Sequence, residues 1–389
     1  MLNWIWVNTH FDYFYKANKC YKERNKSREI GVDKENKRSS AFELLRLVAM
    51  FMVVWGHCMM TTAKDQEPYL GTLDNIGWFV GAFTVCAVNE FFLLTGYFAR
   101  SDNFKVGRIL SIWLKTFTYS TVIYIVVACI QQTFSVRELI TCMLPITTKQ
   151  YWYMQVYIVL FFLTPYISLC MEHLTKKQHT FLIAVLLVFF SLHQTFIKVA
   201  RTLDQSQGYG IIWAVVMLIV GNWLKKYGNE YIEKIRSGLF LIAYTLCSVA
   251  IFISNYLVVK LDIAGGVTSR GNFYAYNSIT VLVQSICLFC WFVQLSETMR
   301  YRKGVNWLGK NTLAVYLISA HPMLLYPLWT DVFHMSQYWD KPVLYVALSI
   351  IFTIIVMILC ICVDKIVDGI DGKLGVISQI KKVNRLIGF

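Results

Sequence analysis

Long apolar runs recur along almost the whole chain, and short polar connections separate them. Ten such runs lie at roughly 41–61, 77–99, 109–130, 151–171, 180–197, 210–224, 237–259, 273–295, 307–328 and 343–363. A helix needs about 20 apolar residues to cross the hydrocarbon core of a bilayer, and most of the runs are this long, although the fifth and sixth are shorter. Backbone polar groups cannot stay unpaired in lipid, so each run must be helical. The pattern predicts an all-α polytopic bundle of about ten transmembrane helices.

The composition agrees with a membrane protein. Hydrophobic residues make up 57% of the chain and charged residues only 15%, which leaves too few polar side chains to cover a soluble domain of this length. The aromatic content of 16% suits a protein whose Trp and Tyr side chains line two membrane interfaces. Most of the 11 cysteines fall inside apolar runs, where they are expected to be small buried hydrophobes, and no cluster of cysteine with histidine predicts a metal site.

The net charge of +14 raises the question of nucleic-acid binding. The basic residues do not gather on one face but recur at alternate connections, which is typical of membrane topology. They concentrate in residues 1–40, in the second, fourth, sixth and eighth connections, and in the tail. We therefore expect no nucleic-acid partner, a place in the cell (inner or plasma) membrane, and both termini in the cytoplasm. The expected division is a basic cytoplasmic segment (1–40), a membrane domain (41–364) and a basic tail (365–389).

The first run carries three ionisable residues, Glu43, Arg46 and His57. Such groups are costly inside a membrane and indicate function by default. Arg46 and His57 are eleven positions apart, or about three turns plus 20°, so they share one stripe about 16 Å in length. Glu43 lies one turn from Arg46 and can pair with it. The alternative is that Arg46 snorkels to the interface while His57 makes one interhelical hydrogen bond. Because Arg46 and His57 share one stripe of the helix, we favour a functional role for the two residues.

Other polar residues stand inside or at the ends of later runs. Asn89 and Glu90 precede two phenylalanines in the second run, and Glu90 could equally be a structural partner for an arginine. The fourth run opens with aromatic and amide side chains that could also form an ordinary interfacial belt. In the ninth run a histidine precedes proline, and its role could be no more than to satisfy the backbone at a kink. The candidates in these two runs are Trp152, Tyr153, Gln155, Asn311, Tyr316 and His321.

Four segments in order resemble the acyltransferase-3 family of multi-pass membrane acyltransferases. They are Arg38-Ser-Ser-Ala-Phe-Glu-Leu-Leu-Arg46 with ten residues before His57, the run Val88–Tyr97 with its Phe-Phe and Thr-Gly-Tyr, the run Tyr151–Met154 followed by Thr164-Pro165, and the run Trp307–Pro322 with Leu-Gly, Tyr-Leu-Ile and His-Pro. The resemblance spans about residues 38–363. Thr95 stands where the family usually has Ser, and Lys105-Val-Gly-Arg108 stands where two arginines are common.

The resemblance implies an O-acyltransferase that moves an acyl group, commonly acetyl, from cytoplasmic acyl-CoA to a hydroxyl, often on a cell-surface carbohydrate. Acyl-CoA is then a co-substrate, and we expect no tightly bound cofactor. A histidine suits the activation of a weakly nucleophilic sugar hydroxyl, so His57 is predicted to be the general base, with Glu90 as the carboxylate that holds its tautomer. Transfer through an acyl-histidine is equally compatible with the sequence. Cys58 is a poorer nucleophile candidate because it points about 100° away from His57 on the helix.

The remaining candidates would bind substrate. Arg46 could stabilise oxyanion charge or bind CoA phosphates, and its depth favours phosphate binding or pairing with Glu43. Lys105 and Arg108 at the expected cytoplasmic mouth are candidates for the nucleotide phosphates. The predicted substrate-binding set is Glu43, Asn89, Lys105, Arg108, Trp152, Tyr153, Gln155, Asn311, Tyr316 and His321.

Two other classes of membrane protein compete with the acyltransferase. A transporter or flippase of an amphiphilic or lipid-linked glycan would use the same buried charges as a path, and usually has broken helices in repeated halves. A polysaccharide polymerase would be expected to carry a large external loop, whereas the longest outer connection here is near 131–150. The ordered motifs and short connections favour the acyltransferase. The sequence leaves the acceptor open among capsular, O-antigen and exopolysaccharide, teichoic acid, peptidoglycan and a lipid-linked glycan.

Overall fold

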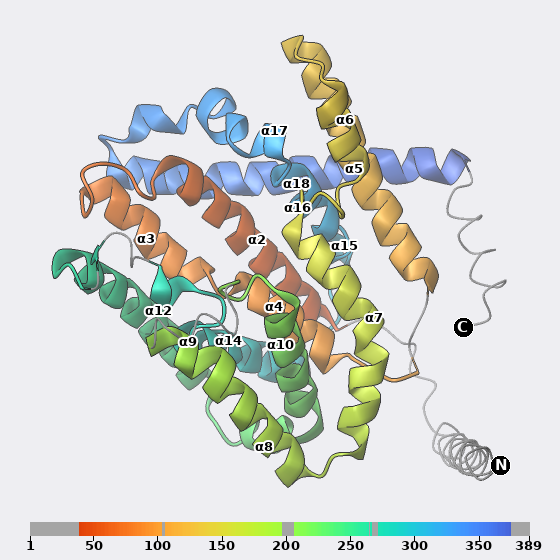
Figure 1. Cartoon of the computed structure of the whole chain (residues 1–389), viewed down its shortest axis with the longest axis vertical. Helices are drawn as coiled ribbons and strands as arrows, with labels where there is room; N and C mark the ends of the chain where they lie inside the picture. The colour runs from red at the N-terminus through yellow and green to blue at the C-terminus, as the bar shows by residue number, and fades with distance from the viewer. Residues whose placement is uncertain (1–38, 103–105, 197–205, 264, 267–270, 375–389) are drawn as a thin grey trace, which may run out of the picture. The chain divides into compact units, whose positions relative to one another are not determined.

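The computed structural model describes residues 39–102, 106–196, 206–263, 265–266 and 271–374, and every regular element in these ranges is a helix (Figure 1). The all-α prediction is confirmed. Lys105, nearly all of the expected N-terminal segment and residues 375–389 of the expected tail lie outside the described residues. The elements are α2 (Ser40–Thr62), α3 (Thr72–Thr84), α4 (Ala87–Tyr97), α5 (Val106–Gln131), α6 (Val136–Met143), α7 (Trp152–His173), α8 (Lys176–Leu187), η1 (Val188–Leu192), α9 (His193–Phe196), α10 (Ile211–Trp223), η3 (Leu224–Gly228), α11 (Asn229–Ile232), α12 (Ser237–Lys260), η4 (Asn272–Tyr274), α14 (Ile279–Thr298), α15 (Lys303–Gly309), α16 (Thr312–Ser319), α17 (Pro322–Leu325), η5 (Leu328–Val332), η6 (Met335–Tyr338) and α18 (Pro342–Leu374).

Nine stretches of the described chain are helical, long and apolar enough to cross a membrane. They are Ser40–Thr62, Thr72–Tyr97, Val106–Gln131, Trp152–His173, Lys176–Phe196, Ile211–Ile232, Ser237–Lys260, Asn272–Thr298 and Pro342–Ile370. A tenth candidate is the bent pair Thr312–Ser319 and Pro322–Val332, whose two parts meet at 77°. These ten coincide with the ten predicted runs. Large apolar side chains such as Phe181 (71% exposed) and Val343 (84%) stand on the outer surfaces of the bundle, as expected of residues that face lipid.

The bend between Thr312–Ser319 and Pro322–Val332 occurs at His321–Pro322. Proline has no backbone N–H and cannot continue a helix from the preceding turn. The backbone N–H of Met323 donates to Nδ1 of His321 (3.2 Å), so the imidazole caps the short helix α17. Nε2 lies 3.2 Å from the carbonyl oxygen of Ser120 on α5 and donates to it, because a carbonyl can only accept. The break is therefore stabilised by one side chain that links two helices.

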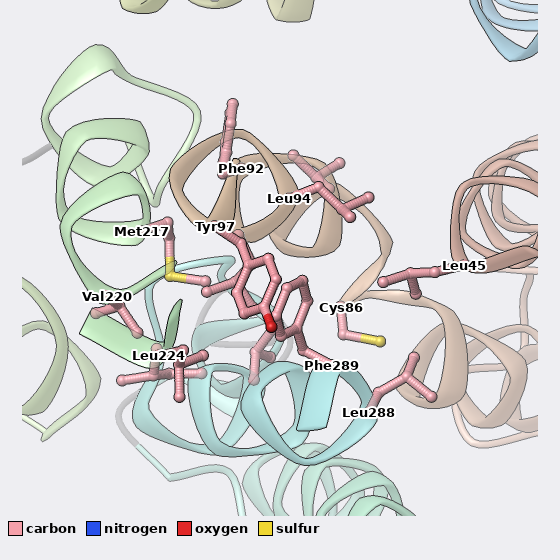
Figure 2. Packing of buried hydrophobic residues seen from close by; sticks show 14 of the residues in the cluster. Leu45, Cys86, Phe92, Leu94, Tyr97, Met217, Val220, Leu224, Leu288 and Phe289 are labelled. Atoms are coloured by element: carbon pink, nitrogen blue, oxygen red, sulfur yellow. The ribbon is translucent and has the colours of Figure 1, made fainter. Parts of the chain in front are cut away.

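Glycines allow α4 and α10 to approach closely. A Cβ on Gly96 would lie 2.1 Å from the carbonyl oxygen of Leu218, and a Cβ on Gly221 would lie 2.4 Å from that of Leu93. Small residues at such crossings let helix backbones pack directly against one another in membranes. Tyr97, one position after Gly96, packs its ring against Phe289 of α14 with centroids 5.3 Å apart (Figure 2). Helices α4, α10 and α14 thus form one tightly packed block.

Helix α2 lies at the centre of the fold and packs against α3, α4, α14, α15, α16 and α18. Its first turn is fixed to α15: the Ser40 hydroxyl donates to Asn306 (2.5 Å), and the absence of a side chain at Gly309 leaves room for the Glu43 carboxylate, which a Cβ there would meet at 2.6 Å. The signature residues of the first and fourth motifs are therefore in direct contact. This central position lets one face of α2 line an internal cavity.

Candidate active site

A cavity of about 340 Å³ lies inside the bundle. This is within the usual range for small-molecule sites, about 300–1,000 Å³. Its walls come from α2, α3, α4, α5, α7 and α16, and from the connections that precede α10 and α14. The lining is mostly apolar and aromatic with a few polar groups, which is typical of a site that binds an organic ligand.

One stripe of α2 runs along this cavity. The lining residues on it recur every three or four positions, and they are Arg46, Met50, Val53, His57 and Met60; Lys64, just beyond the end of α2, also lines the cavity. This spacing keeps side chains on one helix face. The predicted common face of Arg46 and His57 is therefore present, with about 16 Å between them along the axis. Arg46 to Met60 covers about 21 Å of helix, so the lining reaches through most of the roughly 30 Å of hydrocarbon.

His57 presents its imidazole to the cavity. Its Nδ1 is buried and has no hydrogen-bond partner in the part of the chain that the structure describes. The nearby Thr61 hydroxyl donates to the carbonyl oxygen of His57 (2.9 Å), and Thr84 donates to Val80 (3.0 Å), so neither hydroxyl is committed to the ring. Gly56 also lines the cavity beside it, and a Cβ there would lie 3.5 Å from Thr84 Oγ1. The imidazole thus has open space next to it.

Arg46 lies nearer the start of α2. Its guanidinium donates to the Glu43 carboxylate at 2.7 Å; the Glu43 side chain is 1% exposed and that of Arg46 is 30% exposed. The predicted pair is formed, and it still leaves Arg46 on the cavity wall. Tyr157, also on the wall, feels the charges of both Arg46 and the exposed Arg108 of α5. Two guanidinium groups from different helices therefore lie around one end of the cavity, which is an arrangement that can bind phosphate.

Glu90 does not accompany His57. It is fully buried, and neither carboxylate oxygen has a hydrogen-bond partner among the described residues. The predicted Glu90–His57 hydrogen bond is therefore not formed, and Glu90 makes no pair with any arginine that the structure describes. On α4 the cavity is lined by Ala87, Val88 and Phe91, whereas Glu90 is not part of the wall and lies near Cys86 and Cys290. The rotation of α4 about its own axis, which the spacing of residues along α4 cannot reveal, keeps the Glu90 carboxylate away from the His57 imidazole.

Glu43 and Arg108 are also not part of the cavity lining, and four other predicted contacts lie outside it. Asn89 is buried in a hydrogen-bond network with Trp213, Tyr276 and Ser285. Asn311 donates to the carbonyl oxygen of Trp307 (2.7 Å), and both ring nitrogens of His321 are engaged at the bend. Gln155, the fourth, also lies off the wall. The side-chain hydrogen bonds of Asn311 and His321 are thus made within the protein, which for His321 agrees with the kink interpretation.

Three predicted aromatic residues do line the cavity, namely Trp152, Tyr153 and Tyr316. Among the lining residues that were not predicted are one lysine and three tyrosines, Lys64, Tyr209, Tyr274 and Tyr276. None of the four lies in one of the long α-helices, so the 3.6-residue period of those helices gives no direction for their side chains. The only sequence signal was the density of aromatic residues in the segment Asn272–Tyr276. Lys64 lies with its Nζ 3.8 Å from the ring centroid of Trp78.

Comparison with known proteins gives one match. No curated protein and no solved structure matches this chain significantly. A family model described as an acyltransferase domain matches residues 39–362, which include α2, the whole cavity lining and most of α18. Since the match covers well over half of the chain, this membrane protein belongs to the acyltransferase-3 family.

Proposed function

We propose that this membrane acyltransferase transfers an acyl group, with acetyl as the first candidate, from cytoplasmic acyl-CoA to a hydroxyl of a cell-surface carbohydrate or its lipid-linked precursor. One observation carries the proposal. A guanidinium, Arg46, and an imidazole, His57, line the same cavity on one stripe of α2, about 16 Å apart. A long substrate with a charged end and a reacting end fits that separation.

The Arg46 end suits the donor. Coenzyme A carries several phosphate oxygens, and planar guanidinium groups bind these with two parallel hydrogen bonds. Arg46 and Arg108 would hold the phosphates, and the Glu43 carboxylate keeps Arg46 in place. The basic connections predict that this end faces the cytoplasm, where acyl-CoA is made. The extended pantetheine arm would then reach along the cavity and bring the thioester towards His57.

His57 would act on the acceptor. Its imidazole takes the proton of the acceptor hydroxyl while the hydroxyl oxygen attacks the thioester carbon. The C–S bond then breaks, and the departing thiolate takes the proton back from the imidazolium, so no net proton is released. Such general-base assistance typically contributes about 10²–10⁴-fold in rate. The open space beside the ring, and the lack of a described hydrogen-bond partner at Nδ1, support this role.

Radiolabelled acetyl-CoA tests the proposal in membranes that contain the full chain. We expect label to enter carbohydrate with the wild type and with His173→Gln, a control at an exposed position at the end of α7. His57→Ala should reduce the incorporation by about 100-fold or more. Incorporation that survives His57→Ala would remove His57 from the role of base. If the wild type incorporates no label from any acyl-CoA, a transporter of an amphiphilic glycan becomes the better account of the cavity.

A further inference from the structure

Three aromatic rings from three separate elements converge on the wall of the cavity. Trp152 opens α7, Tyr209 precedes α10, and Tyr276 precedes α14. The Trp152 and Tyr209 centroids are 4.5 Å apart, Tyr209 and Tyr276 are 4.7 Å apart, and Trp152 and Tyr276 are 5.9 Å apart at an interplanar angle of 21°. We call these residues the aromatic triad. An interfacial belt would point such rings outward to lipid headgroups, whereas these three line an internal space.

The backbone that carries the triad is held rigidly. The Tyr276 N–H donates to the carbonyl oxygen of Gln207 (3.1 Å), which ties the two connections together. Between them Gly208 adopts φ +87°, and a Cβ there would lie 2.7 Å from the Cβ of Tyr276. Only glycine meets both demands, a left-handed backbone and no side chain. Tyr209 and Tyr276 are therefore fixed side by side.

The buried side chain of Asn89 also holds the backbone that carries the aromatic triad. Its Nδ2 donates to the carbonyl oxygen of Tyr276 (2.9 Å) and to the Ser285 hydroxyl (3.1 Å), and its Oδ1 accepts from Trp213 Nε1 (3.0 Å). The side chain is fully buried, and these bonds join α4, α10 and the start of α14. Buried amides that are satisfied in this way fix one arrangement of their neighbours. The hydrogen bond from Asn89 to Tyr276 therefore fixes the triad to the tightly packed block of α4, α10 and α14.

Although the triad is well held, its rings are not fully covered. Tyr209 leaves 45% of its surface exposed, and Trp152 and Tyr276 are only half-buried. Aromatic faces are electron-rich and attract polarised C–H groups, of which the face of a pyranose ring presents several. The hydroxyl of the exposed Tyr209 can in addition bond to a sugar hydroxyl. These are the groups that a carbohydrate acceptor needs on its binding wall.

The aromatic triad and Arg46, the proposed donor-binding residue, lie towards opposite ends of the cavity. Successive spans run in opposite directions, so the starts of α7, α10 and α14 lie on the side where α2 ends, away from the Ser40 end near Arg46. We propose that Trp152, Tyr209 and Tyr276 form the platform on which the acceptor sugar stacks, with Asn89 as the positioning residue of that platform. This inference rests on the proposed function. It predicts that the triad serves transfer to the acceptor and not the binding of the donor.

The test separates these two steps. Transfer is measured as [¹⁴C]acetyl incorporation into the glycan of membranes from cells that naturally make the protein, and donor binding as [¹⁴C]acetyl-CoA retained by the purified full chain in lipid nanodiscs. We expect Tyr276→Leu and Trp152→Leu each to lower transfer about tenfold while the affinity for acetyl-CoA stays within about twofold. Tyr276→Phe and Trp152→Phe, which keep the ring face, should retain transfer within about threefold.

Each other outcome is decisive. If the leucine variants lose acetyl-CoA affinity, the triad stacks the donor's adenine or supports the fold, and the acceptor platform is overturned. Transfer that is unchanged in both leucine variants overturns it as well. A wild type that neither binds nor transfers overturns the proposed function and the acceptor role with it, which is distinguishable from a triad-specific failure.

Asn89 has its own readout. Asn89→Asp keeps an oxygen for Trp213 but removes the donor to Tyr276. We expect lower transfer with acetyl-CoA affinity retained, and little further loss when Asn89→Asp is combined with Tyr276→Leu, because both changes disturb the same platform. Fully additive losses, or a loss of acetyl-CoA affinity, would instead assign Asn89 a purely structural role.

Discussion

Two histidines of the membrane domain differ sharply in what their imidazoles do. Both stand in spans, and both were candidates from sequence. His321 is fully buried, and both of its ring nitrogens are engaged, one as the cap of α17 and one with α5. His57 lines the cavity, and its Nδ1 has no hydrogen-bond partner over the described residues. The difference teaches that location in the membrane does not by itself mark a functional histidine. What distinguishes the two histidines is whether their ring nitrogens already have hydrogen-bond partners within the protein.

Local backbone structure explains the difference. His321 precedes Pro322 at a helix break, where amides at the start of the next helix lack partners and a side chain must supply one. His57 lies inside the uninterrupted helix α2, where the main chain satisfies its own hydrogen bonds. An imidazole in an intact helix remains available for chemistry, provided that open space lies beside it.

The largest expected effect is on catalysis at His57. His57→Ala should lower acetyl transfer about 10²–10⁴-fold, because the proton of the acceptor hydroxyl loses its base. The thermal unfolding midpoint in detergent should stay close to that of the wild type, since no described hydrogen bond to Nδ1 is lost. A large drop in that midpoint would make His57 a structural residue like His321 and would abolish the contrast.

The converse applies to His321. His321→Ala should destabilise the bundle by roughly 1–3 kcal/mol, because the amide of Met323 loses its partner and the link from the imidazole to the Ser120 carbonyl of α5 is lost. His321→Asn, which offers a short capping oxygen, should recover part of this loss. Transfer per folded molecule should remain within a few-fold of the wild type. A loss of transfer as large as that of His57→Ala, in molecules that remain folded, would contradict the structural assignment.

A smaller effect is expected for Arg46, which shares the stripe with His57. Arg46→Lys keeps a positive charge near Glu43 but removes the planar fork, so the affinity for acetyl-CoA should fall about tenfold. The matched control is Arg100→Lys, in an exposed pair with Asp102, and it should have no measurable effect. Equal affinities of Arg46→Lys and the wild type, measured by equilibrium binding of labelled acetyl-CoA, would argue against a phosphate contact.

The smallest effect should come from Gly56, next to His57. A methyl group there meets Thr84 Oγ1 at an ordinary 3.5 Å, so Gly56→Ala should fold normally. It nevertheless narrows the cavity beside the imidazole, and we expect transfer to fall about threefold, more for propionyl than for acetyl. Gly238→Ala on α12, where a Cβ would meet nothing within 4 Å, is the control. Identical acyl preferences in the two variants would place the reacting group elsewhere.

Features that depend on one helix were predictable from sequence. Hydropathy located the nine candidate spans of the described chain and the bent pair that would be a tenth, and the 3.6-residue period placed Arg46 and His57 on one face, because both follow from local geometry. The Glu43–Arg46 pair, one turn apart, was predictable for the same reason.

Features that depend on how helices pack were not predictable. Glu90 stands beside lining residues in sequence, yet it faces Cys86 and Cys290, because the orientation of α4 is set by its packing on α10 and α14. Tyr209 and Tyr276 meet only because two distant connections are tied together. The carbonyl acceptor for His321 comes from Ser120, on another helix. Such pairings are tertiary, and spacing along a single chain does not contain them.

The most direct measurement is the initial rate of labelled acetyl transfer to carbohydrate, per folded molecule, for His57→Gln and His321→Asn in the same membranes. A rate for His57→Gln at least about 100-fold below that of the wild type, with His321→Asn within a few-fold of it, is what a base at His57 predicts. Comparable rates in the two variants would contradict the assignment of catalysis to the cavity face of α2.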